Sequence, residues 1–206
     1  MKAVLDACVL YPTVLREILT GVAGAGLYTP LWSARILEEW ARATRKIGPL
    51  AEGIARGEVA QLTAAFPNAA IAPQPGLEGR LHLPDENDIH VLAVAIAGSA
   101  DAIITFNARD FPRHVLASEG LARRDPDGFL WELWSHHPQA VGAVIAGVQA
   151  KAERLSGQPH ALRPFLKRAG LPKLAKALQS GGLQSGAAQS GAAQSGGLQS
   201  GGLQSG

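Results

Sequence analysis

Residues 83–112 constrain the fold more than any other stretch, because they read as a helix followed by a buried strand. Asp85 suits the N-cap of this helix, so that Asp88 falls in its first turn. The helix carries apolar residues at helical spacing and stops at Gly98. Residues 102–106 then form a continuous apolar run, as expected for a strand that is covered on both faces. This stretch therefore predicts one helix–strand unit of a parallel sheet.

The preceding and following residues repeat this alternation of strands and helices. We expect strands at residues 2–6, 27–32, 69–73 and 121–126, helices at residues 12–24, 33–45, 50–66 and 127–134, a helical turn at residues 114–117 and a loop over residues 74–83. Ser33 has the residue type of an N-cap for the second of these helices. Strands that alternate with helices predict an α/β fold whose central sheet is mainly parallel.

The chain divides into three segments of different composition. Residues 1–135 hold the expected α/β domain, and residues 136–178 form a basic helical extension broken at Gly170. Residues 179–206 repeat Gln-Ser-Gly followed by Gly-Leu or Ala-Ala, with no charged, aromatic or β-branched residue. Such a segment cannot bury enough surface to offset its chain entropy. We therefore expect a disordered tail.

Charge is distributed unevenly along the chain. Residues 1–138 contain 12 Lys and Arg against 16 Asp and Glu, whereas residues 139–178 contain 7 against 1. An acidic body with a basic end fits a cation site in the body and a polyanion bound outside it. The alternative is that the basic end is simply a solvated helix face.

Several classes of protein are disfavoured by composition. Cys8 is the single cysteine, so an internal disulfide is excluded, and no Cys/His spacing suits zinc. Asp6 comes too early for a signal peptide, and no apolar run approaches the roughly 20 residues of a membrane span. We expect a cytoplasmic protein that does not enter a membrane.

Acidic and amide side chains recur at one edge of the expected sheet. Asp6 ends the first strand, Asn107 and Asp110 follow residues 102–106, and Asp88 and Glu39 come from helices. Because ligands of open parallel sheets bind at the carboxyl ends of the strands, we expect these side chains to meet there. Crowded carboxylates repel one another unless a cation balances them, and hard oxygen ligands favour Mg²⁺ or Mn²⁺. Such ions can polarise a phosphodiester and activate a water molecule.

Other side chains near these positions have simpler interpretations. We assign Asp85 only a capping role and Glu38 a surface ion pair, in contrast to its neighbour Glu39. Thr105 either positions a carboxylate or is merely structural, and Arg109 either contacts RNA phosphate or pairs with a nearby acid. Cys8 is interpreted as a small packed residue, because no histidine partner for a nucleophile is evident.

Four motifs, taken in order, resemble the PIN domain family. They are Asp6 after an apolar strand, the Ser33-x3-Leu37-x-Glu39-Trp40 helix, Asp88-x-x-Val-Leu-Ala-x-Ala, and Ile-Ile-Thr-Phe-Asn107-x-x-Asp110-Phe-Pro. The closest resemblance is to the bacterial group that contains the VapC-like toxin ribonucleases, and it covers roughly residues 1–135. The segment from Arg168 to Lys173 also resembles carboxy-terminal extensions of that group.

The resemblance implies a Mg²⁺- or Mn²⁺-dependent ribonuclease on a PIN-like three-layer α/β/α sandwich. By motif position, Asp6, Glu39, Asp88 and Asp110 would be its catalytic and metal-binding acids. Asn107 would be a further metal ligand at a place where many relatives have Asp, and the neutral amide lowers the charge of the site.

The leading hypothesis from the sequence is an endoribonuclease that is the toxin of a type II toxin–antitoxin pair. RNA would be its substrate, and the amphipathic carboxy-terminal helices would bind an antitoxin or close a homodimer. The alternative is a catalytically weak or inactive PIN-like module that binds RNA or protein. Asn107 and the basic end of the chain motivate this alternative.

Overall fold

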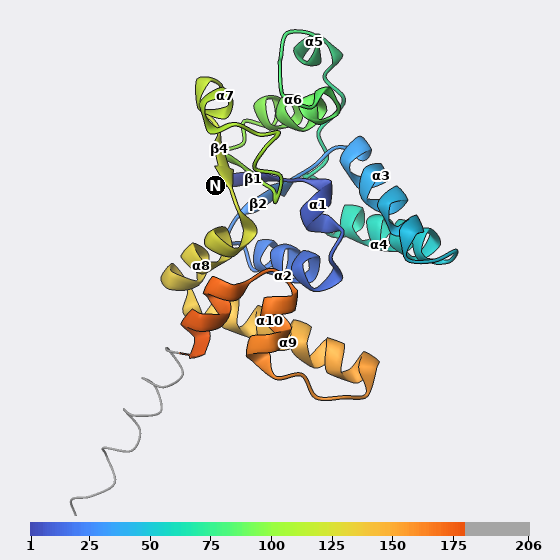
Figure 1. The fold of residues 1–206 in the computed structure, drawn as a ribbon, viewed down its shortest axis with the longest axis vertical. Coiled ribbons are helices and arrows are strands. Elements are labelled where there is room, and N and C mark those ends of the chain that lie inside the picture. Colours follow the sequence, from blue (N-terminus) through green and yellow to red (C-terminus); the bar gives the residue numbers. More distant parts are fainter. Residues whose placement is uncertain (180–206) are drawn as a thin grey trace, which may run out of the picture.

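Four parallel strands form a single sheet at the centre of the molecule (Figure 1). The computed structural model describes residues 1–179. The strands are β1 (Lys2–Leu5), β2 (Thr29–Leu31), β3 (Ala102–Ile104) and β4 (Ala122–Arg124), in the order β2-β1-β3-β4. In the register of the sheet, Val4 of β1 pairs with Leu31 on one side and Ile103 on the other. Because all pairings are parallel, the strands end at one common edge.

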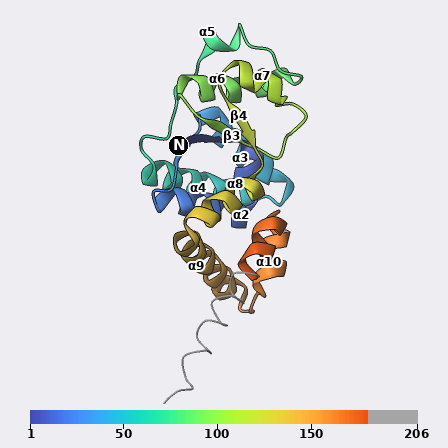
Figure 2. The same ribbon diagram turned by 90° about the vertical axis from the view of Figure 1, so that its left-hand side faces the viewer.

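Helices cover both faces of this sheet. They are α1 (Ala7–Leu10), α2 (Thr13–Gly24), α3 (Ala34–Ala43), α4 (Ala51–Ala65), α5 (Pro75–Glu78), α6 (Ile89–Ala97), α7 (Arg113–Ser118), α8 (Pro126–His136), α9 (Pro138–Ser156) and α10 (Leu162–Arg168), with 3-10 turns η1 (Thr44–Lys46) and η2 (Glu86–Asp88). Helices α6 and α7 lie over one face, and α2 and α8 lie over the other (Figures 1 and 2). The three-layer α/β/α sandwich is therefore confirmed.

The core explains why the central strands read as unbroken apolar runs. Val4 of β1 and Ile103 of β3 are completely buried, because helices cover them from both faces of the sheet. Trp32 and Trp40 are also buried and hold α3 against the body of the domain. The core thereby fixes the ends of β1 and β3, from which the loops of the candidate site emerge.

Local signals in the sequence set several element boundaries correctly. The hydroxyl of Ser33 accepts the backbone N–H of Ile36 over 3.2 Å, so the expected N-cap of α3 is confirmed. Helix α6 ends at Gly98, as its sequence predicts. The turn at residues 114–117 and the strand at residues 121–126 are present as α7 and β4.

Three expectations are corrected by the structure. The strand expected at residues 102–106 is β3, which ends at Ile104, and the hydroxyl of Thr105 directly after it donates to Asp6. Residues 69–73 make only an isolated bridge between Ala70 and Trp32, since flanking prolines lack the N–H groups that would extend a ladder. The expected loop at residues 74–83 contains the short helix α5, and α1 directly after Asp6 was not expected.

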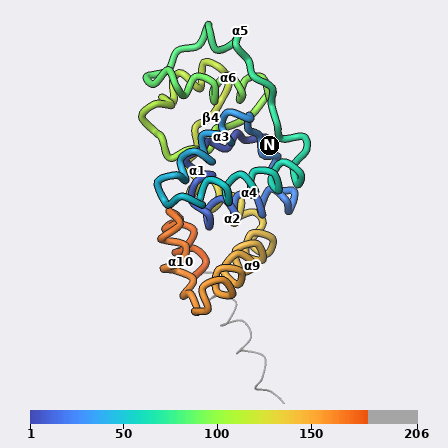
Figure 3. Tube along the Cα trace, turned by 90° about the vertical axis from the view of Figure 1, so that its right-hand side faces the viewer, coloured from blue at the N-terminus to red at the C-terminus, as the bar shows by residue number. Residues whose placement is uncertain are grey.

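The basic extension packs below the sandwich as further helices. Helix α9 contacts both α2 and α8, and residues 172–179 are helical beyond α10 (Figures 1 and 3). The repeat that we expect to be disordered begins at residue 179, and residues 180–206 lie outside the described part of the chain. Among residues 1–179, no helix combines the length and hydrophobicity of a bilayer span.

Candidate metal centre

Three carboxylates converge at the edge of the sheet where the strands end. Asp85 and Asp88 come from the turn η2 before α6, and Asp110 comes from the loop after β3. One oxygen from each of these side chains lies within 4.8 Å of the others, and all three side chains are half-buried. An all-oxygen donor set of this size is compatible with a hard divalent cation.

Asn107 joins Asp88 to the loop that carries Asp110. Its side-chain Nδ2 donates to Oδ2 of Asp88 over 2.9 Å, and its Oδ1 accepts the backbone N–H of Asp110 over 3.3 Å. Its own backbone N–H donates to Oγ1 of Thr105 over 2.9 Å. Both ends of the amide are thus engaged, which gives Asn107 an orienting role; its expected role as a metal ligand stays a prediction.

Asp6 lies at the end of β1 and is only 7% exposed. Its Oδ2 accepts the hydroxyl of Thr105 over 2.7 Å and the thiol of Cys8 over 3.0 Å. Burial, followed by the charge of Asp6, raises the pKa of Cys8 to about 12, so the thiol keeps its proton and serves as a donor. Within residues 1–179, no hydrogen bond occupies Oδ1 of Asp6.

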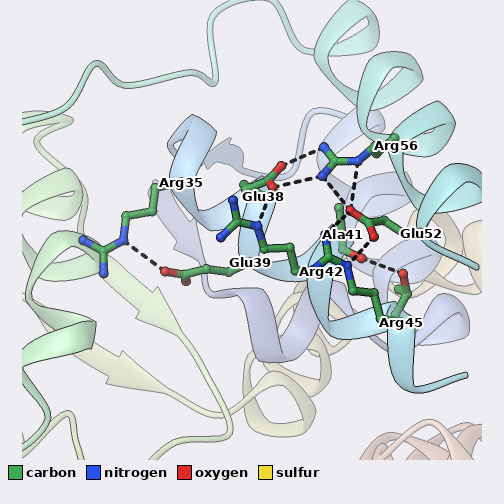
Figure 4. A network of polar contacts seen from close by, with 9 residues as sticks. Arg35, Glu38, Glu39, Ala41, Arg42, Arg45, Glu52 and Arg56 are labelled. Carbon is green, nitrogen blue, oxygen red and sulfur yellow. Dashed lines mark hydrogen bonds and ion pairs between the residues drawn. The ribbon is translucent and has the colours of Figure 1, made fainter.

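Glu38 and Glu39 leave α3 in different directions, as Figure 4 shows. Glu38 pairs with Arg42 over 2.6 Å and with Arg56 of α4 over 2.7 Å. Hydrogen bonds from Arg56 and then Arg42 lower the pKa of Glu38 to about 2. This pairing agrees with the surface role that the sequence suggested for Glu38, and it ties α4 to α3.

Glu39 turns toward α6 instead, where His90 and Arg35 hold it. Its Oε1 lies 3.1 Å from Nε of Arg35 and 3.1 Å from Nε2 of His90. Arg35 also donates to the backbone carbonyl of Asn87 over 3.1 Å, next to Asp88. Burial alone raises the pKa of Glu39, but His90 and Arg35 outweigh it, and the pKa lies below its usual value. The carboxylate is therefore ionised and fixed near the acidic cluster.

His90 is a deeply buried polar side chain next to these acids, at 3% exposure. Its Nε2 lies close enough to Glu39 for an ion pair, but the angles are not those of a hydrogen bond. Its Nδ1 has no hydrogen-bond partner among the described residues. This close approach of a buried imidazole constrains the direction in which Glu39 points.

The acids influence one another through their charges. Burial, followed by repulsion from four neighbouring carboxylates, raises the pKa of Asp88 from 3.8 to about 6. The four neighbours, in order of effect, are Asp6, Asp85, Asp110 and Glu39. The ionised cluster is therefore electrostatically unfavourable by itself, and a bound cation would relieve this cost.

This repulsion predicts that Asp88→Asn stabilises the protein when divalent ions are chelated. In the unfolded chain Asp88 titrates near 3.8, whereas in the folded protein it titrates near 6. The ionised form therefore destabilises the fold above about pH 6, and this cost disappears below about pH 4, where both states are protonated. Thermal unfolding in EDTA should give the variant a higher Tm than wild type near pH 7.5.

The same measurement near pH 4 should bring the two melting temperatures together. Glu86→Gln is the matched control, because Glu86 lies exposed in the same turn and has no partner within the described chain. A variant Asp88→Asn that melts below wild type at both pH values would contradict the repulsion.

One cavity opens beside Glu39 and Cys8, and none of Asp85, Asp88 and Asp110 lines it. It has a volume of about 470 Å³ and is lined by Glu39 and Cys8 together with Tyr11 and Lys46. A second cavity of about 490 Å³ lies between α2, α4 and α9, and none of the clustered acids lines it. The first cavity gives the site an approach with an aromatic and a cationic side chain.

Of the acids that the sequence singled out, the structure places Asp88 and Asp110 in one cluster and adds Asp85 to them, whereas Asp6 and Glu39 lie outside it but close enough to raise the pKa of Asp88. Sequence reasoning gave Asp85 only a capping role; it does accept the backbone N–H of Asn87 over 2.9 Å, but it also lies in the three-carboxylate cluster. Its spacing of three residues from Asp88 was the available signal, because residues so spaced share a helical face. His90 was missed, since nothing in the sequence distinguishes it from an ordinary helix residue.

Comparison with known families gives one match. A model described as PIN domain matches residues 2–109, which is more than half of the chain. Asp110 lies one residue beyond the matched range, and the other clustered acids lie inside it. Comparisons with curated proteins and with solved structures find no match.

Proposed function

Since the chain belongs to the PIN domain family, we propose that it is a metal-dependent endoribonuclease that hydrolyses phosphodiester bonds of RNA. PIN domains are generally nucleases, and they usually use divalent metal ions. The observation that carries the proposal is the cluster of Asp85, Asp88 and Asp110 at the carboxyl edge of the sheet. The raised pKa of Asp88 supports it, because crowded acids of this kind are typical of cation sites.

Mg²⁺ or Mn²⁺ is the cofactor that we propose. Asp85, Asp88 and Asp110 would hold it, with Asp6 and Glu39 as further acids that lie close enough to raise the pKa of Asp88. When bound, such an ion polarises the scissile phosphate, lowers the pKa of a water molecule and stabilises the leaving oxygen.

Hydrogen bonds orient the acids that would take part in this reaction. Thr105 and Cys8 fix Asp6 through one oxygen and leave the other oxygen without a hydrogen bond from the described residues. Asn107 orients Asp88 and the backbone of Asp110. The free oxygen of Asp6 can then orient water or accept its proton while water attacks phosphorus and the bond to the leaving oxygen breaks.

Cleavage of RNA by the full chain should depend on added divalent ions. We expect a labelled single-stranded RNA to be cut in Mg²⁺ or Mn²⁺ and to stay intact in EDTA, because the carboxylates cannot bind a phosphodiester without a balancing cation. Product lengths on a denaturing gel provide the measurement. Cleavage that persists at the same rate in EDTA would contradict the proposal.

We propose further that this nuclease is the toxin of a toxin–antitoxin pair. The support is the resemblance of its motifs to VapC-like ribonucleases. The antitoxin, or a second copy of the chain, would bind the amphipathic helices of the basic extension. A cytoplasmic location follows from an RNA substrate of this kind.

One observation favours a second candidate, a PIN module that binds RNA without cutting it. The side chain of Asn107 forms hydrogen bonds with Asp88 and with the backbone of Asp110. Because it is an amide, the site has one carboxylate fewer than it would with Asp at that position. Calorimetric titration with Mn²⁺ separates the two. Binding at millimolar or better affinity that is lost in Asp6→Asn supports the nuclease, whereas no binding favours the module.

A further inference from the structure

Phe106 is the aromatic side chain that stays exposed next to the acidic cluster. It is 46% exposed, although it follows buried β3 closely and immediately precedes Asn107. Its backbone N–H donates to Sγ of Cys8 over 3.3 Å, which holds the chain at the edge of the site. Among residues 1–179, it is the one aromatic among the large apolar side chains that are exposed. The catalytic roles proposed above leave this ring unused.

One edge of the ring rests on the carboxy-terminal arm, by which we mean residues 162–179. Gly170 in this arm has a φ of +80°, and a Cβ built there would lie 3.2 Å from Cζ of Phe106. A side chain at this position would therefore be strained and would crowd the ring. The backbone of the arm therefore lies close to one edge of the ring, and Phe106 as a whole remains 46% exposed.

The arm is firmly attached at this place. The carboxylate of Asp127 in α8 accepts the backbone N–H of Lys173 over 2.7 Å and that of Leu174 over 2.9 Å. Nζ of Lys173 lies 3.5 Å above the ring of Trp131. Helix α10 lies on the side of the molecule where the strands end, away from the start of β1 (Figures 2 and 3). The arm thus borders the candidate site.

Two arginines near Phe106 or Gly170 in the sequence are exposed and form no ion pair among the described residues. Arg109 follows Phe106 by three residues, and Arg168 precedes Gly170 by two. Neither forms an ion pair within the described residues, in contrast to Arg56, which pairs with acids of α3 and α4. Unpaired guanidinium groups bind phosphates, and an exposed aromatic ring next to them stacks on unpaired bases.

We propose that Phe106 stacks on an unpaired base of the RNA while Arg109 and Arg168 contact nearby phosphates. This inference rests on the proposed function and deepens it by naming residues of this chain that bind the substrate outside the acidic cluster. Stacking needs an unpaired base, because the faces of bases in a duplex are already covered by their neighbours.

The test measures binding without cleavage. Fluorescence anisotropy is recorded with a labelled single-stranded RNA of about 12 nucleotides, long enough for one stacking site, and full-length protein that carries Asp88→Asn to keep the RNA intact. Adding Phe106→Ala should weaken binding by about 5- to 100-fold, whereas Phe106→Tyr should stay within about 2-fold. Leu155→Ala is the control, because Leu155 is 80% exposed on α9, and it should bind as the parent does.

The arginines are tested by the salt dependence of the same binding. Arg168→Ala should reduce the slope of log Kd against log salt concentration by about 0.7, the value of one phosphate contact in single strands. Arg154→Ala is the matched control, because Arg154 is exposed on α9 and makes no ion pair within residues 1–179, and it should leave the slope unchanged.

Two results would overturn the proposal. One is a Phe106→Ala protein that binds single-stranded RNA as tightly as its parent; the exposed ring would then serve a protein contact. The other is an equal loss of binding to single-stranded and to duplex RNA. Because binding is measured without turnover, a wild-type chain that fails to cut RNA refutes the nuclease and leaves this test intact.

Discussion

Replacing Asp88 with asparagine should lower RNA cleavage by at least about 100-fold, since changes to groups that only orient metal ligands already cost about 10- to 100-fold. Asp88 lies in the three-carboxylate cluster, is oriented by Asn107 and carries the raised pKa. Asparagine has nearly the same shape and can still accept the bond from Asn107, so the loss would be one of charge and not of packing. Initial cleavage rates in Mn²⁺ provide the measurement.

Glu86→Gln serves as the control for this variant, because it removes the same charge from the same turn, outside the cluster. It should cut RNA at the wild-type rate. If Asp88→Asn also cuts at the wild-type rate, the catalytic assignment fails. Expression in a bacterial host extends the comparison to the proposed toxin: wild type should arrest growth, and Asp88→Asn should not.

Replacing Phe111 with alanine should destabilise the fold by about 3–5 kcal/mol, the usual cost of removing a buried aromatic ring. Phe111 follows Asp110 directly and is 0% exposed. Arg123 of β4 donates to its backbone carbonyl over 2.9 Å, so the ring and this bond together anchor the end of the loop that carries Asn107 and Asp110. Urea unfolding followed by circular dichroism provides the measurement.

Phe106→Ala is the internal control for this prediction, because it removes the same ring from the same loop. It should cost about 1 kcal/mol or less, since only about half of the ring is withdrawn from water. If the two variants lost equal free energy of unfolding, the difference in burial between the two rings would not determine their contribution to stability. A stable Phe106→Ala protein also makes its RNA-binding test independent of folding.

The fold could be predicted from the sequence largely because its central strands are covered on both faces. Such strands must be apolar where they are covered, and residues 3–5 and 102–104 show this directly. The short elements at the edges of the sheet could not be predicted as reliably from the sequence. Residues 69–73 have the composition of a strand. Whether they pair depends on the segment of this chain that lies beside them, and local propensity does not describe that segment.

The candidate site was predicted less completely, for a physical reason. An aspartate that caps a turn and an aspartate that faces a cation can occupy the same position before a helix. The sequence around Asp85 therefore indicated its capping role and could not indicate its place in the cluster as well. The orientation of Glu39 depends on His90 and Arg35, which lie across a helix interface or one turn away. Such partners become visible only when the helices have been packed.

The positions of the clustered acids along the chain have a consequence for biosynthesis. Asp6 leaves the ribosome first, and Asp110 follows more than a hundred residues later. No nascent chain shorter than this can hold the full set of oxygen ligands. The arm that supports Phe106 is translated later still, at Gly170. The proposed metal site therefore cannot be complete before Asp110 has been translated, and the arm beside Phe106 follows only when most of the described chain has been made.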